Sequence, residues 1–145
     1  MVRSLGVAGC LALAAIAMGG SAPVAAQAQS LAGKVFTSPG GSVLKVITDA
    51  AMLGGSEAEI VEITLPPNSD SGDHMHGVTE TFYVLEGDMQ QVINGKPVSL
   101  KPGMAASIRS TDHVQHKAGP KGAKVLVVWA PGGEIARVTA RWKAQ

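Results

Sequence analysis

The amino-acid sequence predicts an all-β protein, folded as one antiparallel sandwich or barrel domain. A length of 145 residues suggests a single domain. The 18 glycines and 8 prolines gather in clusters that separate short runs of β-branched and apolar residues. No part of the chain beyond its first 28 residues shows the pattern of a long helix. About eight to ten short strands remain, and their frequent turns are typical of sandwiches and barrels.

The first strands are marked by alternation and end at breaker residues. Residues 29–42 form an N-terminal lead-in. Val43 to Thr48 alternates and predicts a strand, whereas the small residues and glycines from Ala51 to Ser56 predict a turn or loop. Ala58 to Leu65 predicts a longer strand with one apolar face. The cluster from Pro66 to Gly72 ends it.

Hairpins are predicted in the middle of the chain. Thr79 to Leu85 is rich in β-branched and aromatic residues, as strands are. Glu86-Gly87-Asp88 predicts a turn, after which Met89 to Ile93 returns antiparallel. Asn94-Gly95 is the strongest short hairpin signal in the sequence, because both residues tolerate the positive φ of a two-residue turn.

The last third of the chain predicts three or four further strands. Val98 to Leu100 and Met104 to Ile108 are short, and Lys117 to Lys121 predicts a turn. Ala123 to Ala130 contains Val-Leu-Val-Val-Trp, a continuous apolar run typical of a buried strand. Glu134 to Trp142 fits either a last strand or a short helix packed on the outside.

The stretch from Gly72 to Gly87 carries the clearest chemical signal. It holds His74, His76 and Glu80 in the spacing H-x-H-x3-E-x6-G. Two histidines two positions apart point to the same face of an extended strand. Glu80 can return to that face if the chain bends at Gly77. Two imidazoles and a carboxylate that converge can bind a transition metal. The alternative is a pair of surface histidines on a polar loop.

At these residues the chain resembles the cupin superfamily, whose first motif is G-x5-H-x-H-x3,4-E-x6-G. His74, His76, Glu80 and Gly87 match this motif in register. Its leading glycine would fall at Asn68, a departure that is mild because asparagine tolerates left-handed turn geometry. The resemblance implies that the two histidines and the glutamate are metal ligands.

The resemblance also implies a fold and an assembly. A single-domain cupin is an antiparallel jelly-roll β-barrel, which agrees with the strand and turn pattern. In this chain the domain would span residues 43–140. Pairing of two protomers is common in cupins, so the resemblance implies a homodimer.

The third histidine ligand that cupins usually have is less well defined here. The second cupin motif matches poorly: counting from Gly103, its histidine would fall at Val114. His113 is one residue short of that position and His116 is two residues beyond it. We expect His113 to be the ligand, because it needs the smaller slip and keeps normal spacing to the apolar strand at Val125. The two histidines are three apart and face opposite sides of a regular strand, so only one should be a ligand.

Three neutral imidazoles and one carboxylate leave one or two coordination positions for water or substrate, whereas a structural site fills all of them with protein. Such donors suit one divalent Fe, Mn, Ni, Cu or Zn ion and disfavour Ca²⁺. An open position favours Lewis-acid catalysis or activation of bound water or dioxygen. No catalytic residue beyond the metal ligands is identified. Five further residues are candidates to line a pocket: Tyr83, Glu86, Gln91, Gln115 and Trp129.

The composition and the candidate site together narrow the possible functions to two classes. A formal net charge of +1, with no basic patch, argues against nucleic acid as a partner. The first hypothesis is a small metal-dependent enzyme, of dioxygenase, isomerase or lyase type, acting on a small organic molecule. The second is a non-catalytic module that binds a metal or a small ligand outside the cytoplasm. A complete ligand set favours the enzyme, and the absence of a clear acid/base partner favours the binder.

The first 28 residues have the features of a secretory signal peptide. Met1 to Arg3 is cationic, Leu5 to Met18 is apolar, and Ala26-Gln27-Ala28 is a cleavage signal before Gln29. The apolar run is too short for a membrane anchor. A lipoprotein box at Val7 to Cys10 is disfavoured, because too little apolar chain precedes it. Export would place the mature protein in the periplasm or the medium, and we expect it not to bind the membrane. Cleavage would also remove Cys10, the only cysteine of the chain.

We therefore predict that the exported protein begins at or near Gln29. Cleavage at this point would leave 11 basic and 11 acidic side chains, since Arg3 is removed. Intact-mass spectrometry of protein from the periplasm or medium measures the mature N-terminus. Exported protein that still carries Met1 or Leu5 would contradict the prediction.

Overall fold

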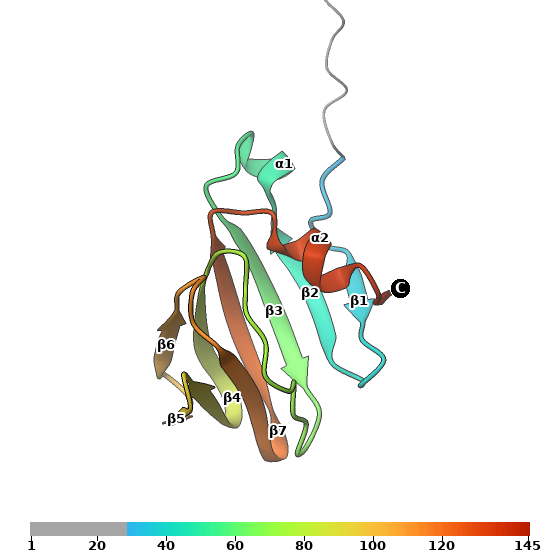
Figure 1. Ribbon diagram of the computed structural model, residues 1–145. Helices are drawn as coiled ribbons and strands as arrows, with labels where there is room; N and C mark the ends of the chain where they lie inside the picture. The colour runs from blue at the N-terminus through green and yellow to red at the C-terminus, as the bar shows by residue number, and fades with distance from the viewer. Residues whose placement is uncertain (1–28) are drawn as a thin grey trace, which may run out of the picture.

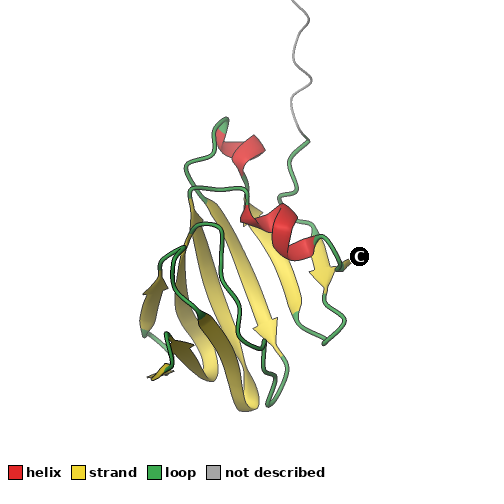
Figure 2. Ribbon diagram, viewed as in Figure 1, coloured by secondary structure: helices red, strands yellow, loops and turns green. Residues whose placement is uncertain are grey.

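Antiparallel β-strands make up most of residues 29–145, the part of the chain that the computed structural model describes (Figures 1 and 2). The expected signal peptide lies outside the described residues. The all-β antiparallel jelly-roll fold that the sequence predicts is confirmed. The described strands are β1 Val35–Thr37, β2 Val43–Thr48, β3 Glu59–Leu65, β4 Thr79–Ile93, β5 Lys96–Leu100, β6 Ala105–Ile108, β7 Val114–Ala130 and β8 Lys143–Ala144.

The strands follow the order β5-β4-β7-β3-β2-β1-β8, and β6 also pairs with β4, along the same edge as β5 and opposite β7. Figure 1 shows the sheet curling so that β5 and β6 lie at one side of the fold and β1 and β2 at the other. The sheet reaches beyond the expected domain bounds of 43–140. β1 lies in the expected lead-in and pairs with β2 and with β8, close to the C-terminus.

Two long strands replace the three shorter ones that the sequence predicts. β4 has 15 residues and β7 has 17, with no turn at 86–88 or at 117–121. The breaker residues at these places form a bend shared by both strands. Gly87 opposes Ala123, and the ladder resumes with Met89 opposite Ala118 after a register shift. Gly87 and Gly122 take positive φ angles of 71° and 78°, so the glycines bend the paired strands without ending them.

The hairpin at Asn94-Gly95 forms as the sequence predicts. Ile93 pairs with Lys96 across the two-residue loop, which joins β4 to β5. The φ angles of Asn94 and Gly95 are 49° and 77°, as a type I′ turn requires.

Both helices of the described chain are short. α1, Ala50–Leu53, overlaps the segment from Ala51 to Ser56 that is predicted as a turn or loop. It begins where the Asp49 side chain accepts a hydrogen bond from the Met52 backbone N–H (2.8 Å). The last segment, for which the sequence allowed either a strand or a short helix, forms the short helix α2, Glu134–Thr139. Neither helix of residues 29–145 is long and apolar enough to cross a membrane.

The core lies against the curled sheet and draws on nearly every strand. On β7, Val125, Val127 and Trp129 are buried, whereas the residues between them are partly exposed. The apolar run that the sequence shows here is therefore not buried on both faces: buried and partly exposed residues alternate along it, and the partly exposed ones are also apolar. Fully buried partners come from β2, β3, β4 and β6: Leu44, Val61, Val84 and Ile108.

The bend of β4 and β7 gives a test of the packing. Gly87→Ala should lower the free energy of unfolding more than Gly95→Ala. Both glycines have positive φ, so each alanine adds about 1–2 kcal/mol of backbone strain. A Cβ at Gly87 would lie 2.2 Å from the carbonyl oxygen of Gly122, whereas one at Gly95 would meet nothing within 4 Å. We expect a further loss of about 1–3 kcal/mol for Gly87→Ala, measured by urea denaturation. Equal losses would show that the strands do not approach this closely.

Candidate metal centre

The loop between β3 and β4, residues 66–78, brings the first two histidines beside β7. Ser71 N–H donates to the backbone oxygen of His116 (3.0 Å), and His74 and Val114 exchange two backbone hydrogen bonds (2.9 and 2.8 Å). The loop therefore runs along the first half of β7 like a short extra strand. As a result, the imidazole rings of His74 and His116 lie 5.0 Å apart, centroid to centroid.

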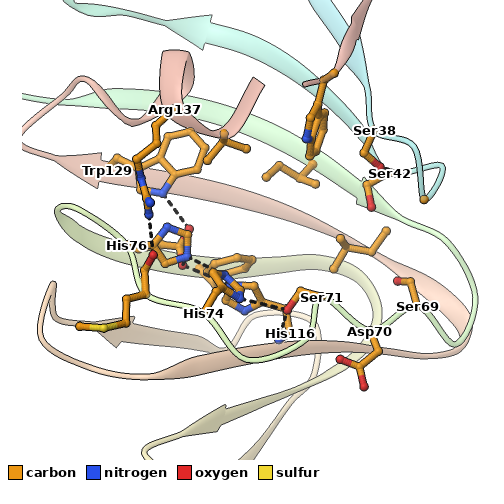
Figure 3. Close-up of a pocket in the computed structure, with 18 residues that line it drawn as sticks. Ser38, Ser42, Ser69, Asp70, Ser71, His74, His76, His116, Trp129 and Arg137 are labelled. Atoms are coloured by element: carbon orange, nitrogen blue, oxygen red, sulfur yellow. Dashed lines mark hydrogen bonds and ion pairs between the residues drawn. The ribbon is translucent and has the colours of Figure 1, made fainter. Parts of the chain in front are cut away.

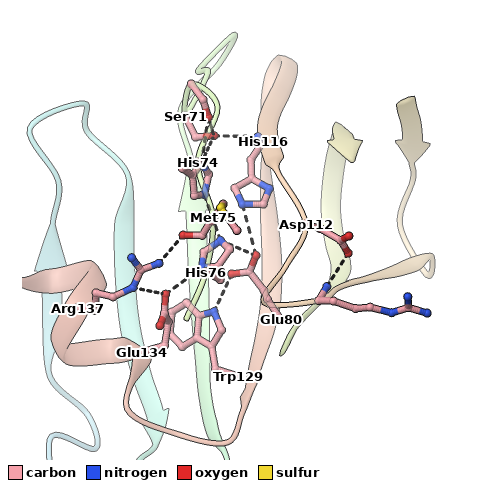
Figure 4. Close-up of polar contacts among 12 residues, drawn as sticks. Ser71, His74, Met75, His76, Glu80, Asp112, His116, Trp129, Glu134 and Arg137 are labelled. Carbon is pink, nitrogen blue, oxygen red and sulfur yellow. Dashed lines mark hydrogen bonds and ion pairs between the residues drawn. The ribbon is translucent and has the colours of Figure 1, made fainter. Parts of the chain in front are cut away.

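Three imidazoles and one carboxylate converge in the interior (Figure 4). The His74 Nε2 and His76 Nε2 atoms are 3.1 Å apart. Glu80 Oε2 lies 2.9 Å from His76 Nε2 and 3.5 Å from His116 Nε2. The candidate ligand atoms of the three histidines all lie within 4.8 Å of one another. The structure thus brings His74, His76 and Glu80 together, with His116 as the third histidine.

His113, the histidine that we expected to complete this set, lies elsewhere. Its side chain is 59% exposed, and its Nδ1 atom lies 2.8 Å from Asp73 Oδ2 at the surface. Strand alternation is the reason. Val114 is fully buried at the start of β7, so His116, two residues later, shares its inward face, and His113 does not. The motif count favoured His113, which is only one residue from the expected position at Val114. The alternation of buried residues along β7 instead turns His116 inward.

Trp129 fixes the orientation of the carboxylate. Glu80 is 1% exposed, and its Oε1 atom accepts a hydrogen bond from Trp129 Nε1 (2.7 Å). The other oxygen, Oε2, therefore faces the imidazoles. Burial alone would raise the pKa of Glu80, but the adjacent imidazoles of His116 and His76 outweigh burial and lower it to about 2. The carboxylate is thus ionised at any pH near neutrality.

His76 is held from behind by a second buried carboxylate. Its Nδ1 atom lies 3.0 Å from Glu134 Oε1, which also accepts a hydrogen bond from Arg137 Nε (2.9 Å). Burial lowers the pKa of His76, but Glu80 and Glu134 together raise it above its ordinary value. The sequence analysis did not identify Glu134 and Arg137, which both lie on α2, as part of the site. Glu134 is 58 positions from His76, and no local spacing links them.

Histidine His74 has the opposite electrostatic balance. Burial lowers its pKa, and the neighbouring His116 and His76 lower it further. Its Nδ1 atom lies 2.9 Å from the backbone oxygen of Gly72, which can accept a hydrogen bond from an Nδ1–H group and so leave the Nε2 lone pair free. A neutral imidazole with a free Nε2 is the form that coordinates a metal.

The donor atoms fit a divalent transition metal. Glu80 Oε2 and His116 Nε2 are buried, and no hydrogen bond of good geometry satisfies either atom. Metal bonds of about 2.0–2.2 Å place neighbouring donors roughly 3.0–3.5 Å apart, which is the spacing between Glu80 Oε2 and the nearby Nε2 atoms. Buried polar atoms without partners are costly, so this arrangement points to an ion as their common partner.

Two of the five residues proposed to line a pocket face inward. Trp129 lies beside the cluster and binds Glu80. Gln91 lies opposite His116 in the β4–β7 ladder, is fully buried, and has no hydrogen-bond partner for either amide atom. The remaining three do not point into the core: Tyr83, Glu86 and Gln115.

A cavity of about 450 Å³ opens onto the cluster (Figure 3). It lies between the sheet and the C-terminal segment, with His74, His76, Glu80 and His116 in its wall. A closed structural metal site has no such space beside it, so the centre is accessible to a small molecule.

Comparison with known proteins assigns the family. Residues 61–129 match the family described as "Cupin domain", and this chain belongs to the cupin superfamily. No curated protein matches the sequence.

Solved structures with the same fold include three bacterial proteins. KdgF from Halomonas sp. is 17% identical with a TM-score of 0.59, covering 68% of this chain and 84% of its own. An RmlC-like cupin from Shewanella frigidimarina is 18% identical with a TM-score of 0.60, covering 69% and 86%. Oxalate decarboxylase of Bacillus subtilis, which has Mn(II) centres, is 18% identical with a TM-score of 0.62, covering 69% of this chain and 28% of its own. At these identities the likeness shows the fold.

The lowered pKa of Glu80 predicts an acid-dependent loss of stability in metal-free protein. A folded pKa of about 2, against 4.5 in the unfolded chain, stabilises the fold above pH 4.5. This stability is lost as the pH falls from 4.5 towards 2, and it amounts to about 3 kcal/mol. Glu80→Gln keeps an acceptor for Trp129 but does not titrate, so its unfolding free energy should fall less over this range. Glu86→Gln, at an exposed position, is the control and should behave like wild type. Parallel pH profiles for Glu80→Gln and wild type in urea denaturation would contradict the prediction.

Proposed function

We propose that this protein binds one divalent transition metal through His74, His76, His116 and Glu80. The convergence of three imidazoles on a buried carboxylate oxygen without a hydrogen bond supports this set most strongly. His116 takes the place that the sequence analysis gave to His113. The metal is Fe, Mn, Ni, Cu or Zn, since all of these accept imidazole and carboxylate donors. The Mn(II) centres of the Bacillus subtilis oxalate decarboxylase support manganese among them.

Four other groups would prepare the ligands. Trp129 orients Glu80 by binding its Oε1 atom, which leaves Oε2 for the metal. Glu134 would accept a hydrogen bond from the Nδ1–H group of His76, so that the Nε2 lone pair faces inward. Arg137 in turn compensates the charge of Glu134. The backbone oxygen of Gly72 does for His74 what Glu134 does for His76. Each contact removes a competing orientation before the metal binds.

The protein is in this proposal a small metal-dependent enzyme of dioxygenase, isomerase or lyase type. The accessible cavity supports it, because a small organic molecule could reach the coordination position that protein ligands leave open. When bound, the metal would supply Lewis-acid chemistry or activate a bound oxygen species. The protein's own part is to hold the substrate beside the metal and to limit the access of water.

One observation favours the second hypothesis, a non-catalytic binding module. Among the residues that line the cavity, the titratable groups outside the ligand set are Asp70 and Arg137. Asp70 accepts hydrogen bonds from Gln115 (2.8 Å) and pairs with Lys117 (3.6 Å), and Arg137 pairs with Glu134. Neither is poised as a general acid or base, so any catalysis would rest on the metal and on Glu80.

Export and dimerisation belong to the same proposal. The signal-peptide pattern of residues 1–28 supports a periplasmic or secreted protein. Tyr83 and Leu85 support a homodimer, because they lie two positions apart on β4 and expose apolar side chains, 43% and 37% of their surface.

Two alanine variants test the ligand set directly. His116→Ala should lose most of the bound metal, because it removes one of four ligands, whereas His113→Ala should keep it. The two changes are chemically identical and lie three residues apart, so they are matched controls. Elemental analysis of the purified, folded variants measures the metal-to-protein ratio, and circular dichroism checks the β fold. Retention of metal in His116→Ala with loss in His113→Ala would reverse the assignment, and full metal in His76→Ala would reject the site.

A further inference from the structure

The cavity beside the cluster is long and its walls are mostly apolar. It extends from the histidines towards the turn that joins β1 and β2, where Ser38 and Ser42 lie at the end away from His76 and Arg137 (Figure 3). Its apolar walls come from β3, β4, α2 and the segment after α2: Ile63, Leu65, Phe82, Val138 and Trp142. At about 450 Å³ it falls within the ~300–1,000 Å³ of pockets that bind drug-sized ligands. A two-carbon acid would leave most of it unfilled.

The charges along the cavity set the charge of its occupant. The proposed metal would bring +2 and Glu80 −1, and the three histidines must be neutral to coordinate. Arg137 is the one basic side chain in the wall, and its charge is matched by Glu134 at 2.9 Å. Asp70 is likewise matched by Lys117 at 3.6 Å. The lined space therefore has a net charge of +1, which one negative oxygen donor neutralises.

A second negative charge would be unfavourable in this space. No wall residue of the described chain offers a basic group that is not already paired. An unpaired charge held against apolar walls costs free energy that nothing here offsets. The end of the cavity formed by the serines offers neutral hydroxyl groups, which suit a neutral polar substituent and not a second anionic group.

From these observations we infer that the site takes an elongated, mostly apolar monoanion. Its single anionic oxygen group would face the metal, and its apolar body would lie along Phe82, Val138 and Trp142. Small dianions of the oxalate type are disfavoured by size and by charge. The inference rests on the proposed metal centre, which supplies the positive charge.

Binding of simple carboxylates to the zinc-loaded protein tests size and charge separately. Zinc is chosen because it has no redox chemistry. Acetate, butyrate and hexanoate differ only in apolar length, and each added methylene that is buried should tighten binding by about three- to fourfold. Adipate has the length of hexanoate with a second carboxylate, and we expect it to bind at least about tenfold more weakly than hexanoate. Isothermal titration calorimetry measures all four dissociation constants.

Variants at Val138 locate the bound chain. Val138→Glu should weaken hexanoate at least about tenfold and leave acetate nearly unchanged, because Val138 lines the cavity where the inference places the apolar chain that acetate lacks. Val98→Glu, the same change at a partly exposed position on β5 outside the cavity, should alter neither. If Val138→Glu does not fold, Val138→Thr keeps the volume of the side chain and should still weaken hexanoate by about threefold.

The zinc content is measured first, so that two kinds of failure are distinct. Wild-type protein without stoichiometric zinc would overturn the metal centre, and with it this inference. Zinc-loaded protein whose affinity does not rise with chain length, or which binds adipate as tightly as hexanoate, would overturn the inference alone. Equal effects of Val138→Glu and Val98→Glu would also overturn it.

Discussion

The antiparallel pairing of β4 with β7 is the constraint on which the rest of the structure depends. It sets Glu80 opposite Trp129 and Gln91 opposite His116. Directly opposed residues in an antiparallel pair point to the same side of the sheet. One ladder therefore places the carboxylate, the indole that orients it and the third histidine on the inner face. The shared bend at Gly87 keeps both halves of the ladder in one curved surface, so the cluster lies on its concave side.

Much of the fold could be predicted because local chemistry decides it. Asn94-Gly95 forms its hairpin since both residues tolerate positive φ, and Val43–Thr48 is a strand because its alternation matches a half-buried position. The lengths of β4 and β7 could not be predicted. A glycine that bends two paired strands and a glycine that ends one have the same local signature, and only the partner strand distinguishes them. At Gly87 that strand is β7, where the carbonyl oxygen of Gly122, 35 positions later, leaves no room for a Cβ.

The residues of the candidate site also fall into those that the sequence predicts and those that it does not. His74, His76 and Glu80 lie within seven residues, so their spacing alone predicts that they meet. His116 depends on which face of β7 is inward, and this is decided by Val114 packing into the core rather than by its distance from any motif. Glu134 and Arg137 come from a helix whose position is a property of the whole fold. Sequence reasoning finds donors that lie close together in the sequence and misses those that tertiary packing brings from distant segments.

The same electrostatics that would stabilise the metal-free cluster suit it to a cation. Glu80 is ionised although it is almost fully buried, so positive charge must lie nearby. Without a metal, a proton on His76 can supply it, and the carboxylates on either side raise the pKa of His76 accordingly. A divalent metal would replace that proton, because the coordinating imidazole must be neutral. In the proposed site, proton and metal would thus compete for the same position. The free-energy cost of burying the Glu80 carboxylate is thus offset by neighbouring imidazoles, which can bind a proton and could instead bind a metal ion.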